Sequence, residues 1–217
     1  MTDRMSGGDE QAGSGLPRKN HGFLLVLCGP SGAGKGTVVS GLMARENQYA
    51  QALEFSVSMT TRSARPGESE GKNYYFVSRE MFEERIKAGA LLEYAEYAGN
   101  LYGTPRDAVE RAVENGKVVL LEIEVRGALQ VKKTFPDAVM VFIMPPTFEE
   151  LEQRLLRRAT ETQEVIAKRL AIAREEYQSV SAFEYYVQND TVSGAVLELD
   201  SIICAERCKV KRRLGEL

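Results

Sequence analysis

Short apolar runs, separated by amphipathic stretches, dominate the chain from residue 21 onward. Three of them are apolar at almost every position: FLLVLC at 23–28, VVLLEI at 118–123 and AVMVFIM at 138–144. Strands that are apolar on both faces are typical of a parallel sheet covered by helices on its two sides. The pattern therefore predicts an α/β fold of three layers, in which helices enclose a central parallel sheet.

The stretches between these runs carry helix boundary signals. Thr104-Pro105 precedes the helical stretch DAVERAVEN, and Gly116 follows it. Thr147 and Glu150 have the spacing of a capping box, in which the two side chains satisfy backbone N–H groups at the start of a helix. Helices are therefore expected after residue 105 and after residue 147.

The pattern changes in two places. Between Glu54 and Tyr97 it breaks into the short β-like pieces EFSVS, NYYFV and LLEYAEY, with one helix at about 79–88. We interpret about 54–104 as a smaller β-rich lobe that is inserted into the main fold. The stretch at about 147–175 has helical spacing but is rich in arginine, which predicts a mobile helical lid rather than a core layer.

Composition bounds the domain organisation. Residues 1–20 are rich in glycine and serine and poor in apolar groups, so we expect a disordered tail. With 217 residues, of which 43% are hydrophobic, the chain can bury one good core, and residues 21–217 are expected to form a single domain. Three cysteines and a single histidine indicate neither a disulfide framework nor a zinc site.

The overall charge gives no general basis for binding a nucleic acid or an anionic membrane. Lys and Arg number 28 against 31 Asp and Glu, a formal net charge of -3. No apolar stretch approaches the ~20 residues of a membrane-spanning helix. We therefore expect a cytoplasmic protein, monomeric or homodimeric, without a nucleic-acid or membrane partner.

A glycine-rich segment directly follows the first apolar run. It consists of Gly29, Pro30, Ser31, Gly32, Ala33, Gly34, Lys35, Gly36 and Thr37. Between a strand and a helix, such glycines let backbone N–H groups approach phosphate oxygens, and the lysine reaches the β and γ phosphates. The segment predicts an ATP-binding P-loop at 29–37, with Lys35 in catalysis and Thr37 as the Mg²⁺ contact. Thr37 stands one residue later than the usual hydroxyl position, and a plain glycine turn is the alternative.

The segment SVSMTTRSARPGESEGKNYYF at 56–76 supplies a second set of anion-binding side chains. It places Arg62 and Arg65 in a loop, with hydroxyl groups at Ser58 and Tyr74 on either side. Two arginines and a tyrosine can hold one phosphate group. A solvated basic turn is the alternative interpretation.

These segments resemble the guanylate kinase family of P-loop nucleoside monophosphate kinases. GPSGAGKGT, SVSMTTRSARPGESEGKNYYF, LLEYAEYAGNLYGTP and ATETQEVIAKRL occur in the family's order and spacing across residues 22–190. The resemblance implies a P-loop NTPase-type fold, a GMP-binding lobe at about 54–104, and ATP with Mg²⁺ as the phosphoryl source. The GMP site that it implies consists of Ser58, Arg62, Arg65, Tyr74, Glu93, Tyr102 and Thr104, of which Arg62, Arg65, Tyr74 and Tyr102 hold the phosphate.

The chemistry of guanine agrees with the place of Glu93 in this set. Guanine presents a ring N–H and an amino group side by side, and one carboxylate accepts hydrogen bonds from both. Adenine presents an acceptor where guanine has its ring donor, and a site built on hydrogen bonds rejects such a mismatch by roughly 10⁴. Ser58 and Thr104 can complete the guanine edge. The alternative is that Glu93 is an exposed strand residue.

Two further carboxylates follow the second apolar run. Glu122 and Glu124 are expected to share one face of a strand at its carboxyl end, where open α/β sheets bind ligands. Glu124 is accordingly added to the predicted GMP site. Two carboxylates so close together require a cation beside them. The family usually carries Asp at position 124 and Gln at 126, so an ion pair between Glu124 and Arg126 is the alternative to a role with Mg²⁺.

Arginines of the predicted lid resemble those that stabilise the transferring phosphoryl group in the family. They are Arg154, Arg158 and Arg169. Phosphoryl transfer depends on positioning and charge stabilisation, so catalysis is expected from Lys35, Mg²⁺ and these arginines, with water excluded by closure. Asn189 and Asp190 resemble the family's adenine-side loop.

Three functions remain open at this point. The first is an enzyme that transfers phosphate from ATP to GMP, with dGMP as a further acceptor. The second is a non-catalytic phosphopeptide-binding module, as in related scaffold domains that have lost a working P-loop, and the third is a kinase for another nucleoside monophosphate. The intact Lys35 favours an enzyme, and Ser58, Glu93 and Thr104 favour GMP.

Overall fold

The structure is a computed structural model that describes residues 21–45, 50–157 and 162–214. The tail predicted at 1–20 and the predicted lid residue Arg158 lie outside the described residues.

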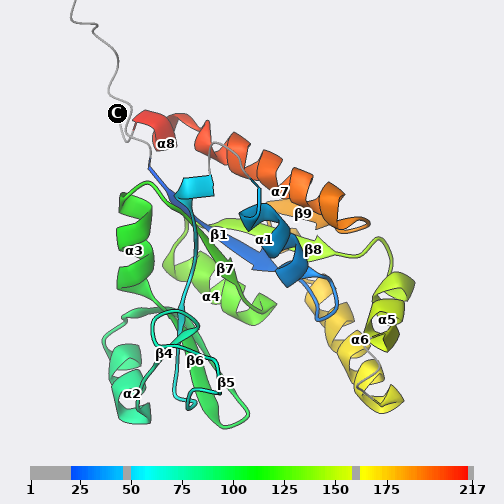
Figure 1. Cartoon of the computed structure of the whole chain (residues 1–217), viewed down its shortest axis with the longest axis horizontal. Helices are drawn as coiled ribbons and strands as arrows, with labels where there is room; N and C mark the ends of the chain where they lie inside the picture. Colours follow the sequence, from blue (N-terminus) through cyan, green and yellow to red (C-terminus); the bar gives the residue numbers. More distant parts are fainter. Residues whose placement is uncertain (1–20, 46–49, 158–161, 215–217) are drawn as a thin grey trace, which may run out of the picture.

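A parallel sheet of five strands forms the centre of the molecule (Figure 1). In spatial order its strands are β2 (Leu53–Phe55), β7 (Val118–Glu122), β1 (Phe23–Cys28), β8 (Val139–Met144) and β9 (Tyr185–Gln188). The three apolar runs of the sequence supply the three middle strands, and every residue of β1 and β8 is buried. The central parallel sheet predicted from continuous apolar runs is thereby confirmed.

Helices cover both faces of this sheet, because successive side chains of a strand point to opposite sides. Leu24, Val26 and Cys28 of β1 pack with α3 (Arg106–Glu114), α4 (Val125–Thr134), α5 (Phe148–Arg157) and α6 (Gln163–Tyr177). Phe23, Leu25 and Leu27 pack with α1 (Lys35–Met43) and α7 (Val192–Arg207) on the other face. The predicted architecture of three layers is confirmed.

A second, mixed sheet forms the small lobe at the lower left of Figure 1. Its strands are β4 (Tyr74–Phe76), β3 (Ser58–Thr60), β6 (Asn100–Pro105) and β5 (Leu91–Tyr97). The single helix of the lobe among the described residues, α2 (Arg79–Lys87), inserts Phe82 into a separate small core with Met59, Leu91 and Leu101. The lobe therefore has apolar packing of its own, apart from the central sheet.

The segment EFSVS, which the sequence predicted as one strand of the lobe, is divided between the two sheets. Leu53–Phe55 pairs with β7 at the edge of the central sheet, and only Ser58 onward belongs to the lobe. Ser56 ends the pairing by donating its N–H to the carbonyl of Leu120. The small sheet therefore begins about four residues later than predicted.

Of the two predicted helix starts, one has a side-chain cap and the other does not. Thr147 accepts a bond from the N–H of Glu150 at 3.1 Å, as expected for a cap before α5. Thr104, in contrast, belongs to β6, and α3 begins at Arg106 without a side-chain cap from Pro105. The hydroxyl group of Thr104 instead donates a hydrogen bond to Glu93.

The arginine-rich helices are also part of the core. α5 buries Leu151 and Leu155, and α6 buries Ile166, Leu170 and Ala173 against the central sheet. Their charged residues lie on the remaining faces, so these helices are amphipathic layers of the main domain, and their motion as a lid stays a prediction.

The remaining short elements are η1 (Ala50–Ala52), η2 (Val180–Ala182) and α8 (Val210–Leu214). Within the described parts of the chain, no helix has both the length and the apolar character that crossing a membrane requires.

Candidate active site

The glycine-rich loop connects the buried end of β1 to α1. Gly29, Gly32 and Gly34 all have positive φ angles, of 143°, 93° and 85°. Gly34 lies just before α1, and no side chain caps the start of that helix among the described residues. The first N–H groups of α1 therefore remain available to an anion. The loop has the strand–loop–helix context that the P-loop prediction requires.

Lys35 folds back over this loop. Its Nζ atom donates to the carbonyl of Gly29 at 2.6 Å and to that of Pro30 at 3.2 Å. Thr37, on the first turn of α1, is exposed. The carboxylate of Glu122 lies nearby, since Oε2 is 4.0 Å from the position that a Cβ atom on Gly36 would take. A lysine, a hydroxyl group and a carboxylate thus surround the start of α1.

Two arginines of the predicted lid lie within the described residues, and they contact the P-loop or the segment that follows β9. Arg169 on α6 donates from Nη1 to the hydroxyl oxygen of Ser31 at 2.8 Å. Arg154 on α5 donates from Nη2 to the backbone oxygen of Asn189 at 2.9 Å and from Nε to Glu150 at 2.8 Å. Arg169 therefore contacts the P-loop itself. Arg154 instead contacts Asn189, the residue that directly follows β9.

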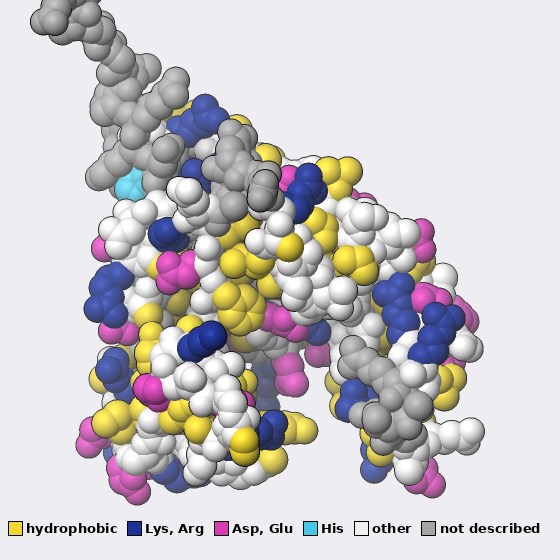
Figure 2. All heavy atoms as spheres, viewed as in Figure 1, with side chains coloured by type: hydrophobic (Ala, Val, Ile, Leu, Met, Phe, Trp, Pro, Cys, Tyr) yellow, Lys and Arg dark blue, Asp and Glu magenta, His cyan; other side chains and the backbone are white. Residues whose placement is uncertain are grey.

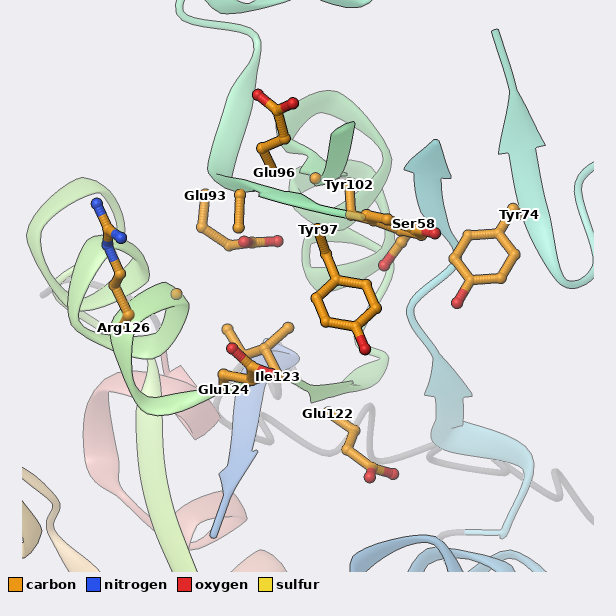
Figure 3. A pocket seen from close by; sticks show the side chains of 13 residues that line it. Ser58, Tyr74, Glu93, Glu96, Tyr97, Tyr102, Glu122, Ile123, Glu124 and Arg126 are labelled. Carbon is orange, nitrogen blue, oxygen red and sulfur yellow. The ribbon is translucent and has the colours of Figure 1, made fainter. Parts of the chain in front are cut away.

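A cavity of about 390 Å³ lies between the small lobe and the carboxyl end of β7. Figure 3 shows Ser58, Glu93 and Tyr102 of the lobe on one side of this cavity, and Glu122 and Glu124 of the main domain on the other. In Figure 2 the hollow between the lobe and α5–α6 has acidic side chains at its floor. Of the predicted GMP site, five residues line this cavity: Ser58, Tyr74, Glu93, Tyr102 and Glu124.

Glu93 is held on β5 by α4. Gln130 of α4 bonds both the N–H and the carbonyl of Tyr94, each at 3.3 Å, and the hydroxyl group of Thr134 donates to the carbonyl of Leu92 at 2.8 Å. These bonds fix the backbone on either side of Glu93. The position of the carboxylate is therefore set by the main domain as well as by the lobe.

The Glu93 side chain is buried and has a defined partner. It is 6% exposed, and its Oε1 accepts a bond of 2.7 Å from the hydroxyl group of Thr104. Its Oε2 would lie 3.1 Å from a Cβ atom on Gly127, so the glycine gives the carboxylate its room. Burial raises the pKa of Glu93, and the bonds from Thr104 act in the opposite direction. The alternative of an exposed strand residue is wrong.

Arg62 and Arg65 lie outside the cavity lining. The guanidinium group of Arg62 forms two bonds with Glu68, of 3.0 and 2.9 Å, and its Cζ is 5.4 Å from the centre of the Tyr74 ring. The pairing with Glu68 raises the pKa of Arg62 and lowers that of Glu68. Arg65 is exposed, and its N–H bonds Glu68. The loop is therefore ordered around Glu68, with Arg62 next to a tyrosine of the cavity.

Glu124 does not share a strand with Glu122, contrary to the prediction. β7 ends at Glu122, and Glu124 is the residue that precedes α4, with φ -74° and ψ 158°. Both carboxylates nevertheless line the cavity, as does Arg126. Among the described residues no ion pair joins Glu124 to Arg126, so the ion-pair alternative receives no support.

Sequence reasoning missed several lining residues. They are Ala95, Glu96, Tyr97, Gly103, Ile123 and Gly127. Tyr97 is 71% exposed and adjoins a tight hairpin tip, where Ala98 and Gly99 both have positive φ angles. The pattern of LLEYAEY gave no indication that the ring of Tyr97 would reach the cavity.

Cys28, at the end of β1 beneath the site, serves as a packing residue. Its Sγ donates to the carbonyl of Ile123 at 3.1 Å, and burial strongly raises the pKa of the thiol. A thiol that resists ionisation is a poor nucleophile.

A Glu93→Gln substitution tests the burial of this carboxylate. Because burial raises the pKa of Glu93 in the folded state, the parent chain loses stability as pH rises from the unfolded value of roughly 4.3 through the folded value. Glutamine carries no such penalty and can still accept a bond from Thr104. The difference in melting temperature, variant minus parent, should therefore increase from acidic to neutral pH.

Glu96→Gln is the matched control, because Glu96 lines the same cavity but is half exposed and pairs with Arg79 at 3.6 Å. Its difference in melting temperature at each pH gives the baseline against which that of Glu93→Gln is compared. A difference for Glu93→Gln that is flat or decreases toward neutral pH would contradict the burial of an ionisable group there.

Comparison with known proteins agrees with this geometry. Residues 22–206 match the family described as Guanylate kinase. A guanylate kinase of Desulfitobacterium hafniense (strain Y51) is 52% identical over 195 residues, which covers 90% of this chain and 96% of that protein. A guanylate kinase of Oceanobacillus iheyensis is 49% identical over 194 residues, covering 89% of this chain and 92% of that protein.

A solved structure supports the same relationship. The crystal structure of guanylate kinase from Anaplasma phagocytophilum superposes with a TM-score of 0.69 at 36% identity, covering 91% of this chain and 93% of the other. The likeness of the fold and the likeness of the sequence thus point to the same family. This chain belongs to the guanylate kinase family.

Proposed function

We propose that the chain transfers the terminal phosphoryl group of ATP to GMP across the cleft between the P-loop and the cavity of the small lobe. This is the ATP:GMP phosphotransferase activity of the family to which it belongs. The observation that carries the assignment of the acceptor side is the buried carboxylate of Glu93, which lines a cavity together with Glu122, a residue that also lies next to Gly36 of the P-loop.

Glu93 and its neighbours provide the groups that guanine requires. A carboxylate that already accepts one bond from Thr104 retains acceptor capacity for the ring N–H and the amino group of guanine. Ser58 lines the same cavity and supplies a further hydroxyl group. Adenine would place an acceptor against the carboxylate, and this mismatch favours GMP over AMP.

The tyrosines and Arg62 form the proposed phosphate end of the acceptor site. Tyr74 and Tyr102 line the cavity with their rings 6.0 Å apart, edge to face. The stacking of Arg62 over Tyr74 holds the guanidinium group at the cavity edge. An incoming phosphate would share Arg62 with Glu68, while Arg65 would have to turn inward from its exposed position.

The donor side consists of the P-loop, with Lys35 over it. When ATP enters, its phosphates can replace the carbonyl groups of Gly29 and Pro30 as partners of Lys35. Arg169, beside Ser31, adds a second positive group at the same place. Both cations lie where negative charge would accumulate during the transfer.

The residues around the start of α1 fit a magnesium ion. Mg²⁺ is usually held by one or two protein oxygens, by water and by the substrate's phosphates. Thr37 and Glu122 would hold it here, and no group of three ligating side chains occurs among the described residues. When bound, the ion neutralises charge on the β and γ phosphates.

The two alternatives receive less support. A phosphopeptide-binding module has no use for an intact P-loop with a placed lysine. A kinase for AMP or a pyrimidine monophosphate would gain nothing from a buried carboxylate at the base position. The monomeric or dimeric state, the use of dGMP and a cytoplasmic location remain predictions.

A coupled assay with GMP, AMP, UMP and dTMP as acceptors tests the proposal. We expect kcat/KM for GMP to exceed that for AMP by roughly 10³ to 10⁴, because AMP leaves the carboxylate facing an acceptor. In Glu93→Gln the side chain presents one oxygen and one NH2 group, so one of guanine's two adjacent donors would face another donor, and kcat/KM for GMP should fall by about 100-fold. Glu83→Gln, at an exposed position of α2 outside the cavity lining, should stay near the parent. Comparable use of AMP and GMP by the parent chain would overturn the base assignment.

Arg62→Ala tests the phosphate end. Removing a charged partner of the phosphate should raise KM for GMP by about 10- to 100-fold and leave KM for ATP within about twofold. Arg79→Ala is the control, because Arg79 is a lobe arginine in surface pairs with Glu83 and Glu96. If KM rises equally for both substrates, Arg62 does not belong to the acceptor site.

A further inference from the structure

Asn189 lies beneath the P-loop and away from the acceptor cavity. It follows β9 directly, and its N–H continues the sheet by donating to the carbonyl of Met144 at 2.8 Å. The residue is 2% exposed. A polar side chain at this depth requires a partner, and the identity of that partner indicates what the residue does.

The partner is the P-loop backbone. The Nδ2 atom of Asn189 donates to the carbonyl of Ala33 at 2.7 Å, a buried bond between residues 156 positions apart. The same nitrogen would lie 2.4 Å from a Cβ atom on Gly34. The amide group therefore fills the space directly under the Ala33–Gly34 peptide, where the chain passes through its left-handed turn into α1.

The amide acts here only as a donor. Its Oδ1 atom is buried and has no hydrogen-bond partner among the described residues. If an oxygen replaced Nδ2, it would face the carbonyl oxygen of Ala33 and repel it. The site therefore distinguishes asparagine from aspartate, although the two side chains have nearly the same shape.

Asn189 also supports the lid side of the cleft. Its backbone oxygen accepts the bond from Arg154, whose Nε is paired with Glu150. This second contact uses the main chain, so a change of side chain at position 189 leaves it in place. The side chain of Asn189 thus contacts the P-loop, and its backbone contacts α5.

We propose that Asn189 is a positioning residue for the phosphate cradle. By holding the carbonyl of Ala33, it keeps the Gly34–Lys35 N–H groups in the orientation that binds the donor nucleotide's phosphates. It acts through the P-loop backbone. The inference rests on the proposed function, because it assigns donor-nucleotide binding to this loop.

Calorimetric titration of the purified chain with ADP alone and with GMP alone provides the test. Asn189→Ala should weaken ADP binding about tenfold, since it removes a buried bond to the loop, and should leave GMP binding within about twofold. Retained GMP binding also shows that the variant is folded. Gln188→Ala, at the exposed preceding position of β9, should bind both nucleotides like the parent.

Asn189→Asp adds a pH signature that a loss of packing would not produce. At neutral pH the ionised carboxylate repels the carbonyl of Ala33, so ADP binding should be weaker than in Asn189→Ala. As pH falls, a protonated carboxyl group can donate to that carbonyl, and the ratio of variant to parent Kd for ADP should decrease.

The outcomes distinguish a failure of the proposed function from a failure of the positioning role of Asn189. If the parent chain binds GMP but not ADP, the proposed function of the P-loop fails. If the parent binds ADP, and Asn189→Ala binds it equally well or loses ADP and GMP affinity together, the positioning role is wrong. A ratio for Asn189→Asp that does not vary with pH would also overturn it.

Discussion

The arrangement of the site depends on one buried carboxylate. Glu93 is taken out of water at the junction of β5 and α4, where a charge is costly unless it is hydrogen-bonded. The hydroxyl group of Thr104, the room left by Gly127 and the clamp of Gln130 on Tyr94 together make that position tolerable. A group kept at such a cost is well suited to recognising a ligand with adjacent N–H donors.

The sequence predicted those features that depend on neighbouring residues. Continuous apolar runs specified the middle strands of the central sheet, since a strand buried on both faces needs apolar side chains at every position. The P-loop could be located because its glycines and lysine are consecutive. Ser58, Tyr74, Glu93 and Tyr102 were assigned to one site through their resemblance to the family, and Glu124 through its place after an apolar run; all five line one cavity.

Other features depend on contacts between distant residues, and no local pattern indicated them. Thr104 has the residue type of a helix cap, yet its hydroxyl group bonds Glu93 across the small sheet. The segment around Ser56 was predicted as one strand, but its first residues pair with β7 and the residues from Ser58 onward pair with β4. Arg62 was predicted to bind the phosphate of GMP, and in the structure its guanidinium group forms an ion pair with Glu68. In each case a partner elsewhere in the chain decides the outcome.

The most direct measurement is a crystal structure of the chain with ADP and GMP bound together. The account predicts that the guanine ring N–H and amino group lie within hydrogen-bonding distance of Glu93, and that the GMP phosphate points toward the P-loop and Lys35. A structure in which GMP occupies another surface, or turns its phosphate away from the P-loop, would contradict it.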